Sequence, residues 1–417
     1  MKICILTHTF PRFEKDVAAP FMDGVASGMV ENKNEVIVLT PFSSKFGKNL
    51  KSKKYKLVLY RYVPFDSWHK LGYSETLTND KTLKFTNLLL SPLMFIFGTI
   101  ALYKLVKKEK IDIVNAHWIL PNGFIASVVS KLTEVPVVST LPGSDVYMAD
   151  RNNLYRYMAK FAAETSSAIS SNSPQLLEDL AQICEKLGTK KGSIQKKSFP
   201  IMYGTDPKKL YPTTKNVLKI RKKLNIKKEN LVISSVGRLV SKKGYKYLIE
   251  AAPTVIKKNR DVVFMIFGEG DQRQELEQRV RELKLEQYFR FPGWVKYDEM
   301  LYYQNLGDIF VLPSIRDEEG NLDDQSVSVV EAMACAKPVV TTDFPGYKIV
   351  IENGKNGYLV PEKRSDLIAK ALIDISTSKT KMVSMSKRSR HLVVNNLTWR
   401  VIGSQYTNLF KKLLNNE

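Results

Sequence analysis

The sequence predicts a protein of two α/β domains, each built on a doubly wound parallel sheet, and three observations lead to this prediction. The chain has 417 residues, more than a single hydrophobic core usually serves. Short apolar runs rich in β-branched residues alternate with helix-like segments, as in parallel sheets with crossover helices. The alternation starts again after a basic, proline-containing stretch near the middle of the chain, so we expect one sheet on either side of it.

The predicted strands are apolar runs bounded by polar residues, glycine or proline. In the first half they are Lys2–Thr7, Glu35–Leu39, Ile111–Asn115, Pro136–Ser139 and Ala168–Ser171. In the second half they are 231–237, 262–268, 288–293, 308–313 and 337–342. Uninterrupted runs of this kind are typical of strands that are buried on both faces.

The domain boundary is predicted within the basic stretch 190–228, which contains several prolines and reads as strandless. We therefore expect one domain over 1–205 and a second over 206–395. The remaining segment, 396–417, is predicted to hold an amphipathic helix over 399–414 that packs back toward the first domain. The apolar positions of this helix are Ile402, Tyr406, Phe410 and Leu413.

Charge and cysteine content limit the partners and the compartment. The net charge of +22 favours an anionic partner: lipid headgroups, a lipid-linked phosphate, a sugar nucleotide or nucleic acid. Ordinary solvated lysine-rich loops at 45–56, 186–197 and 215–228 would explain the charge equally well. No nucleic-acid motif accompanies them, so we expect no nucleic-acid partner. Three distant cysteines and an N-terminus without signal-peptide features predict a cytoplasmic protein without disulfides or a cysteine metal site.

The apolar segment 88–103, which precedes Lys104, Lys107 and Lys108, raises the question of membrane contact. It is shorter than the roughly 20 residues that a membrane-spanning helix needs. We predict a helix or helical hairpin that is buried in the first domain or partly exposed on it. Shallow contact with a membrane surface is the alternative.

The strongest local motif is GRLVSKKG, residues 237–244, between a predicted strand and a predicted helix. Arg238 and Lys243 bracket its loop, and Gly244 opens the helix. An anion in this loop would meet two cations and the positive end of a helix, which suits a diphosphate. The alternative is a surface loop with incidental cations.

A second motif, residues 318–340, also follows a predicted strand and leads into a helix expected to begin near Ser326. Glu331 in its first turns could accept hydrogen bonds from a ribose, while helix-start amides face a phosphate. The alternative is a capping box between Ser328 and Glu331, which would need no ligand.

Together these motifs resemble the retaining glycosyltransferases of family 4, and the likeness extends over nearly the whole chain. It includes the runs 267–295 and 353–361 and the EAMACAKPVV block. The resemblance implies the GT-B fold, in which two Rossmann-like domains face each other across a cleft, with the acceptor bound by the first and the donor by the second.

Carried over residue by residue, the resemblance assigns Arg238 and Lys243 to the donor β-phosphate and Glu331 to the ribose. Asp323 stands where the family has the first acid of an E-x7-E motif, and Glu319 is the alternative if residues are inserted. Further donor-site candidates are Gly237, Gly270, Gly293, Trp294, Val295, Asp324, Gln325, Ser326 and Val327.

In the first half the resemblance points to the loop LPGSD, with Gly143 and Asp145 as candidate substrate contacts. Pro142 occupies the position where the family usually has a histidine. His117, at the end of the preceding strand, could face the same cleft or could be a structural residue.

The implied activity is transfer of a hexose from a nucleoside-diphosphate sugar, with retention, in the synthesis of cell-surface polysaccharide or glycolipid. The donor is expected to be a UDP-sugar, with a GDP-sugar as the alternative, and to act as co-substrate without metal or cofactor. The acceptor is expected to be a saccharide or a polyprenyl-linked saccharide. The protein is expected to be cytoplasmic or peripheral at the inner face of the membrane, and an anionic membrane surface could be a partner there. The alternatives are a sugar-nucleotide 2-epimerase of the same fold and an inactive protein that binds anionic surfaces.

Overall fold

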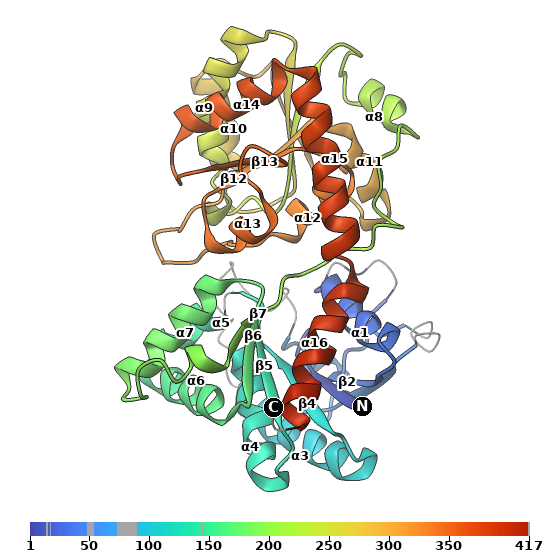
Figure 1. Cartoon of the computed structure of the whole chain (residues 1–417), viewed down its shortest axis with the longest axis vertical. Helices are drawn as coiled ribbons and strands as arrows, with labels where there is room; N and C mark the ends of the chain where they lie inside the picture. The colour runs from blue at the N-terminus through green and yellow to red at the C-terminus, as the bar shows by residue number, and fades with distance from the viewer. Residues whose placement is uncertain (14–15, 17, 48–53, 73–89, 144, 416–417) are drawn as a thin grey trace. The chain divides into compact units, whose positions relative to one another are not determined.

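The computed structural model describes all residues except 14–15, 17, 48–53, 73–89, 144 and 416–417 (Figure 1). Lys48, Lys51 and Lys53 of the predicted lysine-rich loop and positions 88–89 of the apolar segment lie outside the described residues. The chain forms two compact units. Unit 1 comprises Met1–Tyr203 and Trp399–Glu417, and unit 2 comprises Gly204–Thr398.

The strands of unit 1 form one parallel sheet with the order β3-β2-β1-β4-β5-β6-β7. They are β1 (Lys2–Leu6), β2 (Glu35–Pro41), β3 (Lys56–Tyr60), β4 (Ile113–His117), β5 (Val137–Leu141), β6 (Ala168–Ser171) and β7 (Ser198–Pro200). The helices are α1 (Pro20–Glu31), α3 (Ser91–Glu109), α4 (Phe124–Thr133), α5 (Asp145–Ala149), α6 (Asn153–Thr165), α7 (Pro174–Lys186) and α16 (Trp399–Leu414).

Unit 2 repeats the architecture with a parallel sheet of order β10-β9-β8-β11-β12-β13. Its strands are β8 (Leu231–Val236), β9 (Val262–Phe267), β10 (Phe289–Gly293), β11 (Ile309–Leu312), β12 (Val339–Thr342) and β13 (Gly357–Val360). Its helices are α8 (Val217–Lys223), α9 (Tyr245–Lys258), α10 (Arg273–Glu282), α11 (Met300–Leu306), α12 (Val327–Ala334), α13 (Pro345–Val350), α14 (Ser365–Ser376) and α15 (Lys379–Asn396).

The predicted fold class of two doubly wound, Rossmann-like domains is confirmed, since both sheets are parallel and reverse their strand order next to the first strand. Each predicted strand is present within two residues of its expected bounds. Strands β3, β7 and β13 were not predicted. The prediction that 190–228 contains no strand is wrong, because β7 pairs there with β6.

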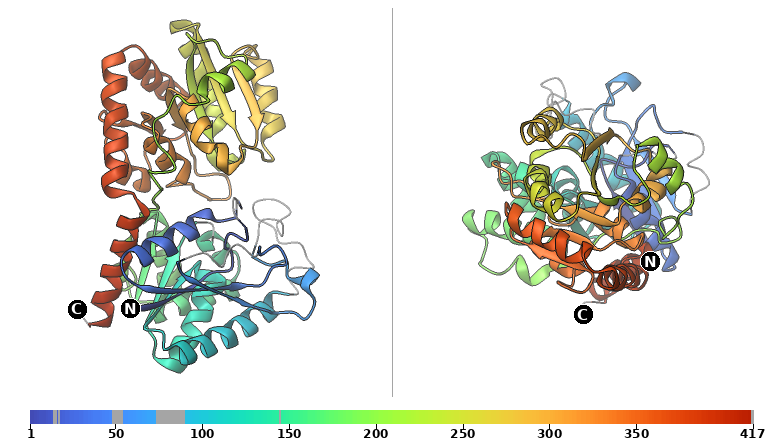
Figure 2. Two further views of the ribbon diagram at one scale, coloured as in Figure 1. Left: turned by 90° about the vertical axis from the view of Figure 1, so that its right-hand side faces the viewer. Right: turned by 90° about the horizontal axis from the view of Figure 1, so that it is seen from above.

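Helices lie on both faces of the unit 1 sheet (Figure 2), and the core of the unit is packed between them and the strands. On one face α3 and α4 cover the strands, and on the other α1 and α16 do so. The last helix has the predicted bounds, and Ile402, Tyr406 and Phe410 are buried in the core of unit 1.

Helices α1 and α16 touch through glycines. A Cβ on Gly28 would lie 2.0 Å from the carbonyl oxygen of Trp399, and a Cβ on Gly403 would lie 2.2 Å from the backbone of Gly28. No side chain fits between backbones at this distance, so these glycines set the close approach of the two helices.

The apolar segment 88–103 forms, over its described part, the first turns of the single helix α3. Met94, Leu102 and Leu105 of this helix are buried against the sheet, whereas Ile96 and Phe97 are exposed. The predicted partly exposed helix is thus confirmed. Over the part of the chain that the structure describes, no helix has the length and apolarity needed to cross a membrane.

Candidate active site

The two motifs singled out in the sequence lie at one place in unit 2. Loop 237–244 follows β8, and segment 313–326 follows β11. These strands are neighbours, with Ile309 beside Ile233, and the strand order reverses between them. Ligands of open parallel sheets bind at the carboxyl ends of the strands at such a reversal. The sheet therefore brings both motifs to the position where this fold class binds ligands.

Backbone contacts hold loop 237–244 in one conformation. The Gly237 amide donates to the Phe267 carbonyl at 3.0 Å, and the Leu239 amide donates to that of Glu269 at 2.9 Å. Gly244, which precedes α9, has a φ of +65°, and a Cβ there would lie 2.0 Å from the Pro313 carbonyl oxygen. Glycine alone combines this backbone angle with this lack of space. The predicted strand, loop and helix are confirmed.

The two cations of this loop differ in burial. The Arg238 side chain is exposed, whereas Lys243 is only 7% exposed. The Lys243 ammonium donates to Asp323 Oδ2 at 2.8 Å and to Ser326 Oγ at 3.1 Å. Burial lowers the pKa of Lys243, and the nearby Asp323 carboxylate opposes this shift. Lys243 thus joins the loop after β8 to the segment before α12.

Asp323 is the carboxylate that contacts Lys243. Its Oδ2 also accepts from the hydroxyls of Tyr347 at 3.3 Å and Ser314 at 3.4 Å. Burial by itself would raise the pKa of Asp323, but the Lys243 ammonium outweighs burial and the pKa lies below its ordinary value. Glu319 is exposed, and its amide donates to Asp317. Of the two acids considered from the sequence, Asp323 is the one beside Lys243.

Helix α12 begins with Ser326 as N-cap and Val327 as its first residue, as predicted. The Ser326 hydroxyl makes no capping bond and instead contacts Lys243 and Ser328. The capping-box alternative is wrong, because Ser328 is the second residue of the helix and not its N-cap.

The residues just before α12 are held by other parts of unit 2. Gln325 and Asp324 are buried. Asp324 Oδ1 accepts a hydrogen bond from the Gly346 amide at 2.6 Å, which ties this segment to the start of α13.

Glu331 lies in the second turn of α12 and is half-buried. Burial raises its pKa to about 7, and a hydrogen bond from Gln304 offsets part of this rise. At neutral pH both the protonated acid and the carboxylate of Glu331 are therefore populated. A ligand that donates hydrogen bonds to Glu331 would favour the carboxylate.

The turn after β9 and the end of β10 lie beside loop 237–244. The Gly268 amide donates to the Gly293 carbonyl at 2.9 Å. A Cβ on Gly270 would lie 2.2 Å from the Leu239 carbonyl oxygen, so this turn packs directly on the loop. After Gly293, Trp294 is 52% exposed and Val295 is buried. An exposed aromatic surface next to the loop can stack on a planar ring.

The candidates of unit 1 lie at the ends of β4 and β5. His117 is fully buried, and its Nε2 lies 2.9 Å from Asn115 Oδ1. Burial lowers its pKa to about 3. Its Nδ1 is buried and has no hydrogen-bond partner among the described residues, so the ring is not fully satisfied as a structural residue, and the assignment of His117 to substrate stays a prediction.

Asp145 is also buried, and its carboxylate accepts from the amides of Ile119 at 2.7 Å and Gly143 at 3.3 Å. Burial raises its pKa to about 7. Asp145 thereby fixes the loops that follow β4 and β5. Gly143 has open space around it, since a Cβ would meet nothing within 4 Å. The assignment of Gly143 and Asp145 to substrate stays a prediction.

One further candidate, which the sequence analysis did not single out, is His8, which follows β1 at the strand-order reversal of unit 1. His8 Nδ1 lies 3.0 Å from Asn122 Nδ2, and its ring centroid lies 4.5 Å from that of Trp118. Burial lowers the pKa of His8 to about 4, so the ring is neutral at physiological pH. The rule that sites lie at carboxyl ends of strands would have identified it.

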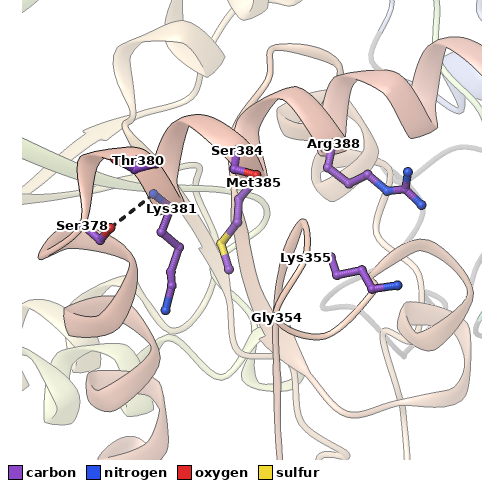
Figure 3. Close-up of a pocket in the computed structure, with 8 residues that line it drawn as sticks. All are labelled: Gly354, Lys355, Ser378, Thr380, Lys381, Ser384, Met385 and Arg388. Atoms are coloured by element: carbon purple, nitrogen blue, oxygen red, sulfur yellow. Dashed lines mark hydrogen bonds between the residues drawn. The ribbon is translucent and has the colours of Figure 1, made fainter.

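Figure 3 shows a hollow in another part of unit 2, beside the first turns of α15. Each of its three cations already has a carboxylate partner: Lys381 pairs with Asp374 at 2.8 Å, and Arg388 and Lys355 share Glu352 at 2.8 Å and 3.4 Å. We therefore assign no ligand to this hollow.

Among the described residues, no group of histidine, cysteine and carboxylate side chains has the arrangement of a metal site.

Comparison with known proteins follows the same division of the chain. Residues 216–392 match the family model of glycosyl transferases group 1, and residues 75–173 match that of glycosyl transferase 4-like proteins. The chain is 29% identical over 307 residues to the Escherichia coli UDP-Gal:alpha-D-GlcNAc-diphosphoundecaprenol alpha-1,3-galactosyltransferase, covering 71% of this chain and 74% of the relative. An uncharacterized glycosyltransferase of Methanocaldococcus jannaschii is 22% identical over 422 residues, covering 99% and 98% of the two chains.

Among solved structures, Anabaena HepE in complex with UDP is similar to 99% of this chain over 100% of its own length, with a TM-score of 0.72 and 18% identity. This similarity shows the same fold.

Proposed function

Because the chain is a glycosyltransferase of group 1, family 4, with the GT-B fold, we propose that it transfers a hexose from a nucleoside-diphosphate sugar to a saccharide or lipid-linked acceptor, with retention. The observation that carries this proposal is the position of Lys243 at the strand-order reversal of unit 2, beside the start of α12. We place the reaction in the synthesis of cell-surface polysaccharide or glycolipid.

The proposed roles follow from where charge develops. As the bond from the sugar C1 to the β-phosphate oxygen breaks, its electron pair leaves with the diphosphate. Arg238, Lys243 and the amides at the start of α12 stabilise that charge, and such preorganised donors act most strongly in a site that excludes water. The acceptor oxygen bonds to C1 on the face that the leaving group vacates, and its proton passes to the departing phosphate. The scheme requires no metal or cofactor.

Asp323 has two roles in this proposal. Before the donor binds, it holds Lys243 through the 2.8 Å ion pair. When the diphosphate takes over Lys243, the Asp323 carboxylate becomes free to accept hydrogen bonds from hydroxyls of the donor sugar, while Tyr347 and Ser314 hold it in its present position.

The donor is proposed to be a UDP-sugar, because the Escherichia coli relative is named for UDP-Gal and the Anabaena structure contains UDP. A GDP-sugar is the alternative. The same relative is named for a diphosphoundecaprenol acceptor, which supports a lipid-linked acceptor here.

A donor and acceptor screen followed by NMR of the product tests the proposal. The expected product has an α-anomeric proton when the donor is an α-linked UDP-sugar. An inverted product would overturn retention. Epimerised donor in a reaction without acceptor would replace the proposal by the epimerase alternative, and failure to bind UDP or GDP in calorimetry would support the inactive binding protein.

Binding of UDP is expected to strengthen as the pH rises through about 7. The raised pKa of Glu331, about 7, leaves it mostly protonated below that pH, and a protonated acid accepts hydrogen bonds from a ribose poorly. If only the carboxylate binds, Kd at about pH 6 is about tenfold higher than at about pH 8. Calorimetry with UDP measures this dependence.

The Glu331→Gln variant is the control, because it experiences the same titration of the ligand's own phosphate without a titrating side chain at position 331. Its Kd is expected to change less with pH than that of the unmodified protein. Equal pH dependence in both proteins would rule out contact between Glu331 and the ribose.

A further inference from the structure

Helix α3 exposes large apolar side chains along one side. They are Leu93, Ile96, Phe97, Ile100 and Tyr103, each 36–53% exposed. Their spacing of three or four residues places them in one row along the helix. We call this row the α3 stripe. Single exposed apolar residues are common on protein surfaces, but a continuous row of this kind marks an interaction surface.

The opposite side of α3 is fixed in the core of unit 1. Met94, Leu102 and Leu105 are buried there. Gly98 lets the helix lie close to its neighbours, because a Cβ at this position would lie 3.0 Å from Ile125 and 3.2 Å from the Tyr60 hydroxyl. The helix cannot rotate to bury the α3 stripe without pulling this side out of the core. Among the described residues of unit 1, the stripe therefore stays on the surface.

Cations continue the α3 stripe toward the end of the helix. Lys104 and Lys107 lie one turn beyond Ile100 and Tyr103, and Lys108 lies one turn beyond Lys104. All three are exposed. Helix α4 packs beside α3 (Figure 1). The last turn of α4 carries exposed Lys131 and Leu132. The surface thus combines an apolar row with a cationic end.

We propose that the α3 stripe and these lysines dock unit 1 on an anionic lipid surface. Since the other side of α3 is held in the core, the helix would lie along the surface, with the apolar row among the upper acyl chains and the lysines at the headgroups. The exposed positions of α3 carry lysines and no carboxylate. A second copy of this chain docked stripe to stripe would leave these cations unpaired, whereas anionic lipids neutralise them.

This proposal deepens the proposed function, on which it rests for its purpose, because docking would bring unit 1 to the lipid phase that holds a lipid-linked acceptor. The binding itself can be measured without any turnover.

Vesicle flotation of the full chain tests the proposal, with phosphatidylcholine vesicles that contain or lack phosphatidylglycerol. We expect the protein to float with the anionic vesicles at low salt and much less with neutral ones. The stripe variant Ile96→Ser, Phe97→Ser, Ile100→Ser and the charge variant Lys104→Glu, Lys107→Glu, Lys108→Glu are each expected to lower binding at least about tenfold.

The matched control lies on α8 of unit 2, which also has exposed lysines and an exposed leucine. The variant Lys219→Glu, Lys222→Glu, Lys223→Glu makes the same change in net charge, and Leu218→Ser removes a 65% exposed apolar side chain. Both control variants are expected to keep at least half of the vesicle binding. Equal loss in the α8 and α3 charge variants would mean that net charge alone drives binding, and would overturn the assignment to α3.

Two further measurements separate the remaining outcomes. Light scattering gives the oligomeric state, and a stripe variant that converts a dimer to a monomer while its flotation is unchanged would overturn the proposal in favour of a second copy. Calorimetry with UDP tests the donor site, which the stripe variant leaves intact. If the protein binds vesicles but not UDP, the proposed function is contradicted and lipid docking is supported. If it binds UDP but does not float with vesicles, lipid docking is contradicted and the donor site is supported.

Discussion

Replacing Lys243 by alanine is expected to lower kcat at least about 100-fold, which is the scale of losing one preorganised donor to developing charge. Lys243 is the buried cation of the loop after β8, and its ammonium lies between Asp323 and Ser326 at the start of α12. A diphosphate at this position would gain more from Lys243 as its charge grows than in the ground state. The loss should therefore appear in kcat more than in KM.

Arg238→Ala is expected to cause a loss of similar size, since its side chain is the second cation of the same loop. Lys246→Ala is the matched control: it removes an exposed lysine from the first turn of α9 and is expected to change kcat less than about twofold. Circular dichroism and thermal unfolding check that each variant folds. Unchanged kinetics in both Lys243→Ala and Arg238→Ala would exclude this loop as the phosphate site.

The second large effect is expected on stability, from Gly28→Leu. By helix propensity alone, leucine would stabilise α1 relative to glycine by about 0.8 kcal/mol. A Cβ at position 28, however, would lie 2.0 Å from the Trp399 carbonyl oxygen, and backbone cannot move aside as a side chain can. We expect the separation of α1 from α16 to destabilise unit 1 by about 3 kcal/mol.

For a unit of this size, that destabilisation corresponds to a fall in Tm of about 6–12 °C, measurable by calorimetry. Glu31→Leu provides the control, because it places the same side chain at the exposed end of the same helix. Its Tm is expected to change by less than about 2 °C. A Gly28→Leu protein as stable as the control would show that α1 and α16 tolerate a wider separation.

The strands that the sequence predicted and those it missed differ in their position in the sheets. Strands such as β1 and β8 are buried on both faces and read as uninterrupted apolar runs. The missed strands β3, β7 and β13 are all edge strands, and exposed or half-exposed residues interrupt their apolar pattern. Edge strands contact one neighbour only, so their sequences are less constrained to be apolar.

The candidate site was predictable where it depends on local order. Arg238 and Lys243 could be singled out because a strand, a glycine-bounded loop and a helix follow each other within a few residues. The ion pair of Lys243 with Asp323 joins residues far apart in the chain, and Tyr347 reaches Asp323 from yet another segment. Such contacts depend on the order of the strands in the sheet, and the local sequence pattern does not reveal this order. His117 shows the same limit. The sequence places it at the end of a strand, but it does not reveal that every residue of this strand, β4, is buried.

The route of the chain through the two units has a consequence for the order of folding during synthesis. The chain leaves unit 1 after Tyr203 and returns at Trp399, and the Thr205 amide bonds the Leu397 carbonyl at 2.8 Å, so unit 2 closes on itself where it begins and ends. Unit 2 can therefore complete its fold once residue 398 has left the ribosome. Unit 1 still lacks α16 at that moment, with the side of its core that Ile402 and Phe410 fill open to water. Although nascent domains generally fold from the N-terminus onward, here the domain that starts first is finished last.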